Sequence, residues 1–136
     1  MLLLLYSICL NIFCETKMSG IPSYIELTSE INQHLAPFRK ESPEVMKAFG
    51  ELARAATKTN VLDEKTKELM AVAIAVAIRC DGCIGFHVKA LVRLGVTKEE
   101  LNENINMAVY LGGGPSLMYA ANVLAAFDEF SAAAGA

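Results

Sequence analysis

The chain is organised around the stretch Glu68-Leu69-Met70-Ala71-Val72-Ala73-Ile74-Ala75-Val76-Ala77-Ile78-Arg79-Cys80-Asp81-Gly82-Cys83-Ile84-Gly85-Phe86-His87. An apolar run follows Glu68, and it ends in a Cys-x-x-Cys with a histidine shortly afterwards. Two thiols separated by two residues can close a disulfide within a single turn at the end of a helix. Cys80 and Cys83 therefore indicate a redox pair, with half of a zinc site and two buried structural thiols as the alternatives.

Cys83 is expected to be the better nucleophile of the pair. If a helix begins near Asp81, its free N–H groups and the positive end of its dipole favour the thiolate form of Cys83. His87 lies four residues further along the same helical face, and its side chain leans back toward the N-terminus. The imidazole can then approach the Cys83 sulfur, which places a base beside a nucleophile.

Glu68 joins this site only if the chain doubles back. One straight helix would leave it about 18 Å from Cys80, whereas a break between Arg79 and Gly82 would form a helical hairpin. Gly82 is expected to permit that break. Glu68 would then hold His87 directly or through a water, which completes an arrangement of nucleophile, base and orienting carboxylate.

The spacing Glu-x11-Cys-x2-Cys-x3-His, formed here by Glu68, Cys80, Cys83 and His87, resembles the signature of the AhpD-like alkylhydroperoxidases. These proteins are a branch of the wider carboxymuconolactone decarboxylase family. The similarity covers roughly residues 44–130 and includes the segments Thr97-Lys98-Glu99-Glu100-Leu101 and Gly112-Gly113-Gly114-Pro115. The best-known branch carries a second histidine just before the second cysteine, where this chain has Gly82.

The resemblance implies a thiol-dependent peroxidase with an all-helical antioxidant fold that assembles as a trimer or hexamer. In that scheme Cys83 reduces a hydroperoxide and becomes a sulfenic acid, and Cys80 resolves it to a disulfide. An external dithiol donor then restores both thiols. Glu68 and His87 would be the proton relay, and the scheme calls for no cofactor and no metal ion.

Two other functions stay open from the sequence. A carboxymuconolactone decarboxylase-like lyase would need a cationic pocket for its substrate, and Arg79, Lys89 and Arg93 are the basic residues near the motif. The decarboxylase branch lacks the cysteine pair, which argues against this function here. The other alternative is a non-catalytic thiol redox sensor, in which the disulfide locks one conformation.

The composition fits one domain that associates with copies of itself. The chain has 136 residues, of which 54% are hydrophobic, and a monomer of this size has difficulty hiding so much apolar surface. A net charge of −3 provides no basic surface for nucleic acid. Because the cysteines do not form the dense framework of a secreted scaffold, we expect a cytoplasmic protein.

The first 17 residues are apolar and contain Cys9 and Cys14. They lack the basic start and the cleavage site of a signal peptide, and the run is too short to span a bilayer as a helix. Met18-Ser19-Gly20 is typical of an ordinary start. We therefore expect residues 1–17 to be a dubious extension and residues 18–136 to be the domain.

Hydrophobic periodicity and capping signals predict about six helices and no sheet. Helix starts are expected at Pro43 with a hydroxyl cap from Ser42, after Asp63, and at a capping box formed by Thr97 and Glu100. Gly95 is expected to end one helix, and the segment 112–115 is expected to break the chain. The predicted ranges are 22–38, 43–58, 64–79, 81–94, 98–111 and 115–130. The helix after Pro43 is expected to bury a stripe made by Val45, Met46, Phe49, Leu52 and Ala53. The segment 69–78 is apolar all round and is expected to be a central buried helix. The fold class is all-α, with a central helical hairpin that carries the cysteine pair.

Overall fold

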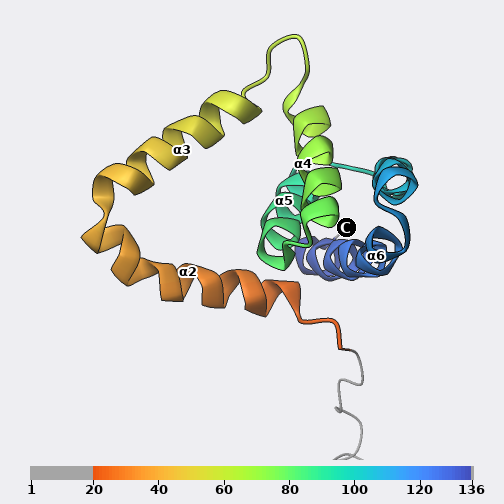
Figure 1. The fold of residues 1–136 in the computed structure, drawn as a ribbon, viewed down its shortest axis with the longest axis horizontal. Coiled ribbons are helices and arrows are strands. Elements are labelled where there is room, and N and C mark those ends of the chain that lie inside the picture. The colour runs from red at the N-terminus through yellow and green to blue at the C-terminus, as the bar shows by residue number, and fades with distance from the viewer. Residues whose placement is uncertain (1–19, 136) are drawn as a thin grey trace, which may run out of the picture.

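A computed structural model of the protein describes residues 20–135. This part of the chain consists of helices and their connections, with no strand (Figure 1). The helices are α2 (Tyr24–Glu41), α3 (Pro43–Thr57), α4 (Glu64–Ile78), α5 (Asp81–Arg93) and α6 (Lys98–Ala134). None of these helices is long and apolar enough to cross a membrane. The all-α prediction is confirmed, whereas the prediction for residues 1–17 lies outside the described residues.

The last helix explains why residues 20–135 form five helices where about six were expected. The predicted segments 98–111 and 115–130 are joined in α6, which is kinked at Gly113 with φ 66° and ψ −153°. The two parts of α6 point in different directions in Figure 1. Gly113 adopts this backbone conformation without a steric penalty because it has no Cβ.

Most of the predicted helix ends are confirmed. The carboxylate of Asp63 accepts a hydrogen bond from the backbone N–H of Thr66 at the start of α4. Thr97 and Glu100 form a reciprocal capping box at the start of α6. The expected hydroxyl cap at Ser42 is wrong, since its side chain makes no capping hydrogen bond, and α3 begins with Pro43 and the acidic Glu44.

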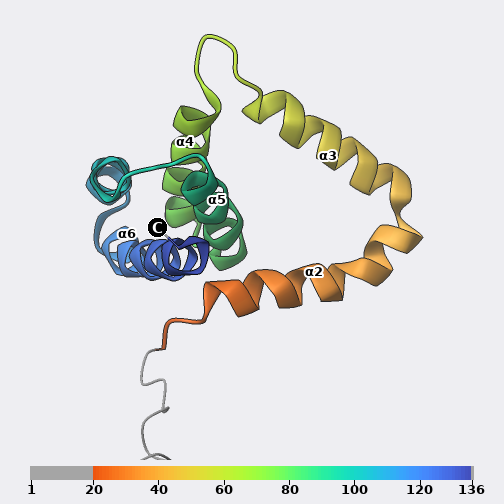
Figure 2. The same ribbon diagram turned by 180° about the vertical axis from the view of Figure 1, so that it is seen from behind.

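The core lies where the α4–α5 hairpin packs against α6 (Figure 2). The largest fully buried apolar side chains come from these three helices and from the start of α2: Tyr24, Val72, Val76, Ile84, Val88, Leu91, Leu101 and Val123. The prediction that segment 69–78 is buried all round is wrong. Ile74 is 60% exposed and Ile78 is 63% exposed, because α4 has helices against only one of its faces.

The chain reverses direction between α4 and α5, as the hairpin required, but Gly82 does not make the turn. Arg79 ends α4 in the left-handed conformation, with φ 60° and ψ 48°, and Cys80 follows in an extended conformation. Gly82 lies inside α5. The prediction that Gly82 permits the break is therefore wrong, and Arg79 is the one residue other than glycine with positive φ in residues 20–135.

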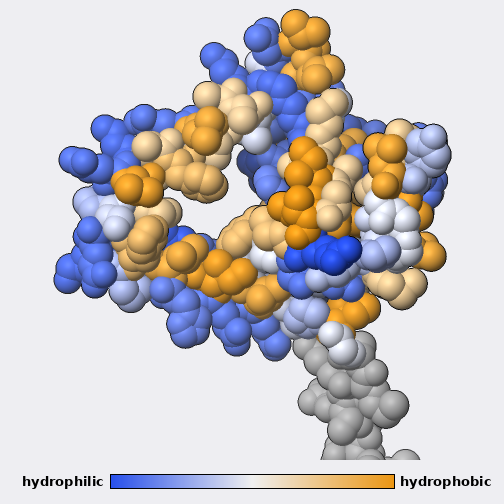
Figure 3. All heavy atoms as spheres, in the orientation of Figure 1, coloured by the Kyte–Doolittle hydropathy of each residue, from blue (hydrophilic) through white to orange (hydrophobic). Residues whose placement is uncertain are grey.

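Helices α2 and α3 form an arm that leaves the bundle and returns to α4 (Figures 1 and 2). The space-filling view shows an opening between this arm and the bundle (Figure 3). The prediction of a buried stripe on α3 is wrong for the single chain. No residue of α3 is buried, and Val45, Phe49 and Leu52 are 61%, 65% and 65% exposed. The arm brings α3 into contact with its chain neighbours α2 and α4 but not with α5 or α6, so most of its apolar face stays exposed.

Candidate functional site

The two cysteines of the motif lie at the N-terminal end of α5 and form a disulfide. Cys80 is the N-cap residue of α5, and its sulfur accepts a hydrogen bond from the backbone N–H of Cys83 at 3.2 Å. Their Cα atoms lie 5.2 Å apart, within the usual range for a disulfide. Both residues are partly buried, so the pair lies at the surface end of the core rather than inside it.

Glu68 and His87 meet across the hairpin. Oε2 of Glu68 on α4 lies 2.6 Å from Nδ1 of His87 on α5. Glu68 is only 6% exposed, and a buried carboxylate needs a hydrogen-bonding partner of this kind. An ionised Glu68 can only accept a hydrogen bond, so the contact places a proton on Nδ1 and leaves Nε2 of a neutral His87 as the basic nitrogen.

His87 and Cys83 share a face of α5, being four residues apart. No hydrogen bond joins them among residues 20–135, since the Cys83 sulfur is in the disulfide and Nδ1 faces Glu68. The imidazole is partly exposed, with 35% of its side-chain surface accessible. The structure thus brings together Glu68 with His87 and Cys80 with Cys83, and it places both pairs along one hairpin.

The basic residues near the motif do not face His87. Arg93 pairs with Glu64 through a 3.0 Å contact at the far end of α5. Lys89 holds its ammonium group 6.0 Å from the centre of the Phe130 ring. Arg79 is exposed and makes no ion pair in the described part of the chain. These three residues do not form a cationic pocket around His87.

A second set of residues, which sequence reasoning missed, holds Asp81, one of the two residues between the cysteines. The Tyr24 hydroxyl donates a hydrogen bond to Oδ1 of Asp81 at 2.8 Å, and the Asn122 amide donates to the same oxygen at 2.9 Å. Burial, and then the hydrogen bond to Asp81, raise the pKa of Tyr24 above its ordinary value. The position of Asp81 inside the motif was the one signal of this contact in the sequence. Nothing in the sequence pointed to Tyr24, which lies 57 residues away from Asp81.

Gly82 and Gly85 lie on the face of α5 against which α2 packs. A Cβ at Gly85 would lie 2.7 Å from Cγ2 of Thr28, and a Cβ at Gly82 would lie 2.9 Å from Cδ1 of Ile31. At Gly85 a side chain would force Thr28 and Tyr24 of α2 to shift, whereas at Gly82 the flexible end of Ile31 could turn aside. Gly85, more than Gly82, therefore allows the close approach of α2 to α5 in this chain.

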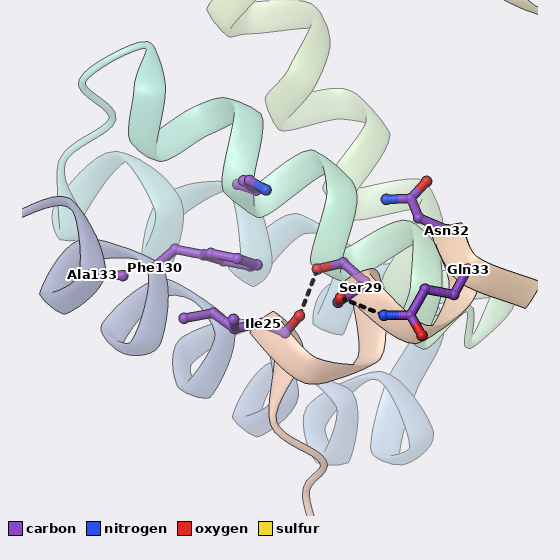
Figure 4. A pocket seen from close by; sticks show the side chains of 8 residues that line it. Ile25, Ser29, Asn32, Gln33, Phe130 and Ala133 are labelled. Carbon is purple, nitrogen blue, oxygen red and sulfur yellow. Dashed lines mark hydrogen bonds between the residues drawn. The ribbon is translucent and has the colours of Figure 1, made fainter.

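A pocket of about 540 Å³ lies on another face of α5 (Figure 4). It is lined by Ile25, Thr28, Ser29, Asn32, Gln33, Lys89, Phe130 and Ala133. Lys89 is two residues after His87, which turns its side chain about 160° away from the imidazole around the helix. The pocket thus contains none of the four motif residues. Within residues 20–135, no three His, Cys, Asp or Glu residues are placed to hold a metal ion.

Comparison with known proteins places these features in a family context. The family model described as CMD, the carboxymuconolactone decarboxylase family, matches residues 43–126. An uncharacterised protein of Cupriavidus necator is 39% identical over 104 residues, which are 76% of this chain and 92% of that protein.

Two solved structures have a similar fold. The apo form of a carboxymuconolactone decarboxylase family protein from Legionella pneumophila is 60% identical, with a TM-score of 0.78 over 79% of this chain and 96% of that one. A family member from Thermotoga maritima, for which involvement in an antioxidative response has been suggested, is 30% identical. Its TM-score is 0.62, and the match covers 66% of this chain and 93% of that one.

Proposed function

This chain belongs to the carboxymuconolactone decarboxylase family, and from that premise we propose that it is a thiol-dependent peroxidase of the AhpD-like alkylhydroperoxidase type. The observation that carries the proposal is the close pair of Cys80 and Cys83 at a helix N-terminus, on the same hairpin as the Glu68–His87 contact. A nucleophile, a resolving thiol and a base held by a carboxylate are the groups that thiol peroxidase chemistry needs.

The proposed reaction begins with the reduced pair. The Cys83 thiolate attacks one oxygen of a hydroperoxide, the O–O bond breaks, and the leaving alkoxide takes a proton to become an alcohol. Cys83 is then a sulfenic acid. The Cys80 thiol attacks the sulfenic sulfur and displaces its hydroxyl as water, which forms the disulfide. An external dithiol is oxidised as it reduces this disulfide and restores both thiols.

Each of the four residues has a role that follows from its position. The free N–H groups at the start of α5 favour the thiolate of Cys83. His87, with Nδ1 held by Glu68, offers Nε2 to take the thiol proton and to deliver it to the leaving alkoxide. Glu68 keeps the imidazole in the correct tautomer and stabilises its protonated form, as a buried carboxylate does in other nucleophile–base pairs.

We further propose that the protein works as a homo-oligomer, a trimer or a hexamer. The apolar residues exposed on α3 need a cover, and a second copy of the chain would supply one. A pocket of about 280 Å³ between α4 and α6 is lined almost wholly by apolar side chains, among them Ile74, Met107 and Leu111. Because its partner reductant is a dithiol, we expect the protein to act in the cytoplasm.

The basic residues near the motif give less support to a carboxymuconolactone decarboxylase-like lyase. A carboxylate substrate would need cations facing the histidine, but Arg93 is paired with Glu64, and Lys89 lines the pocket on another face of α5. The proposed peroxidase uses groups that the hairpin already brings together.

The deciding experiment is thiol titration with intact mass measurement on the reduced protein, before and after one equivalent of hydroperoxide. The wild type should lose two thiols and the mass of two hydrogens, and Cys83→Ser should form no intramolecular disulfide. A Cys9→Ser, Cys14→Ser background isolates the motif pair. Unchanged thiols in the wild type would rule out the peroxidase.

A further inference from the structure

A buried hydrogen-bond network holds Asp81, the residue that follows Cys80 and opens α5. Tyr24 on α2 is fully buried, and its hydroxyl donates to Oδ1 of Asp81. Asn122 on α6 donates to the same oxygen. Two helices that are distant in sequence thus direct their polar groups at the inside of the Cys-x-x-Cys motif.

The position of Tyr24 is fixed independently of this contact. Glu129 on α6 accepts a hydrogen bond from the backbone N–H of Tyr24 at 2.6 Å and another from the Ser23 hydroxyl. This carboxylate caps the start of α2, and the tyrosine ring packs in the core. A phenylalanine could fill the same space, so the hydroxyl and its acceptor call for a separate explanation.

The charge of Asp81 offers an explanation for the hydroxyl of Tyr24. A carboxylate in the first turn of a helix offsets the positive end of the dipole, which is the feature that favours a thiolate at Cys83. Donors that bind the carboxylate draw its negative charge toward themselves. Both donors lie on α2 and α6, away from the Glu68–His87 contact on α4 and α5.

We propose that Tyr24 and Asn122 are positioning residues that hold the Asp81 carboxylate away from the sulfurs and thereby set the reduction potential of the Cys80–Cys83 pair. The inference rests on the redox pair of the proposed function, but it does not require peroxide to be the oxidant. Without the two donors, the charge of Asp81 would oppose a thiolate at Cys83 and so favour the disulfide over the dithiol.

The test is equilibration of the full-length protein with dithiothreitol buffers at neutral pH, with the disulfide fraction read by alkylation and mass. Tyr24→Phe keeps the ring and should shift the equilibrium constant toward the disulfide by roughly threefold or more, as expected for loss of a hydrogen bond to a charged group. Tyr110→Phe is the control, because Tyr110 is 78% exposed and no hydrogen bond of its hydroxyl is found among residues 20–135. It should leave the constant unchanged. Asn122→Ala should shift it in the same direction as Tyr24→Phe.

Asp81→Asn separates this electrostatic role from a structural one. It keeps an oxygen acceptor and removes the charge, so the equilibrium should move toward the dithiol. In that background, Tyr24→Phe should have no further effect on the constant. A Tyr24→Phe protein that melts at a lower temperature but keeps the wild-type equilibrium constant would overturn the proposal.

The same measurement distinguishes the two proposals. If the wild-type pair equilibrates with dithiothreitol but is not oxidised by peroxide, the peroxidase proposal is wrong. The role of Tyr24 is then still decided by the variant comparison described above. A wild-type pair that cannot be reduced reversibly would overturn both.

Discussion

Oε2 of Glu68 lies 2.6 Å from Nδ1 of His87, and the two residues come from opposite sides of the α4–α5 hairpin. If His87 relays protons, His87→Gln should slow peroxide-dependent disulfide formation about 100-fold. Glu68→Gln should slow it by at least about tenfold, because an amide cannot stabilise a protonated imidazole. Stopped-flow mixing of reduced protein with limiting hydroperoxide would measure both rates.

Glu64→Gln is the control for this prediction. Glu64 is a carboxylate one turn earlier on α4, where it pairs with Arg93 rather than His87. Its variant should react at the wild-type rate. Equal rates for Glu68→Gln and Glu64→Gln would remove Glu68 from the relay.

The exposed face of α3 predicts a subunit contact. Phe49→Lys should weaken self-association by at least about tenfold in concentration, because burial of a phenylalanine contributes roughly 1.5–3 kcal/mol. Sedimentation velocity over a range of protein concentrations would measure the shift. Glu51→Lys changes an α3 residue outside the apolar stripe and serves as the charge control. An unchanged distribution for Phe49→Lys would show that this face is not part of the contact.

The close approach of α2 to α5 predicts a cost for a side chain at Gly85. Gly85→Ala should destabilise the protein by about 1–3 kcal/mol, since the new Cβ would lie 2.7 Å from Thr28 and 3.2 Å from Tyr24. Gly50→Ala is the control, because a Cβ there meets no heavy atom within 4 Å. In the α3 helix it should stabilise by about 0.5–1 kcal/mol. Urea denaturation of both variants gives the comparison, and equal stabilities would contradict the tight packing.

Two carboxylates at helix starts, Asp63 and Glu100, predict that the folded protein loses stability in acid. A hydrogen bond from Lys65 lowers the pKa of Glu100, and hydrogen bonds from Thr66 lower the pKa of Asp63. Groups with a lowered folded pKa stabilise the protein above their unfolded pKa, and this stability is lost as the pH falls through the folded value. As the pH falls below about 4.5, therefore, Glu100→Gln and wild type should begin to converge in melting temperature, and the gap should close at still lower pH.

Thermal melts at neutral pH and at about pH 3 would check this prediction. The variant should melt at a lower temperature than wild type at neutral pH, and this gap should be smaller at about pH 3. Glu103→Gln, on the same helix, should show no such difference between the two conditions. A constant gap between wild type and Glu100→Gln at both pH values would contradict the assignment.

The sequence predicted the local features of the fold well. Asp63, the Thr97–Glu100 capping box and Gly95 all mark helix ends that the structure confirms, because these signals act within one turn. The break at Gly113 was predicted as well, and the hairpin that joins Glu68 to His87 followed from the spacing of the motif.

What the sequence could not predict depends on where whole helices lie. The apolar stripe of α3 was expected to be buried within the chain. Hydrophobic periodicity shows which face of a helix is apolar, but it does not show whether the same chain or another copy packs against that face. The break before α5 was expected to depend on Gly82 because glycine propensity favoured it, but the left-handed residue is Arg79, and Gly82 lies inside α5. Tyr24, Asp81 and Asn122 left no pattern, being joined only by the fold.

Cys80 has two simultaneous duties, as the N-cap of α5 and as one half of the disulfide. Any change in the oxidation state of its sulfur therefore changes the acceptor that closes the first turn of the helix bearing His87. A thiolate accepts a hydrogen bond from the Cys83 amide more strongly than a disulfide sulfur does. The amide protons of that turn consequently record the redox state, and their rate of exchange with solvent should differ between the dithiol and the disulfide.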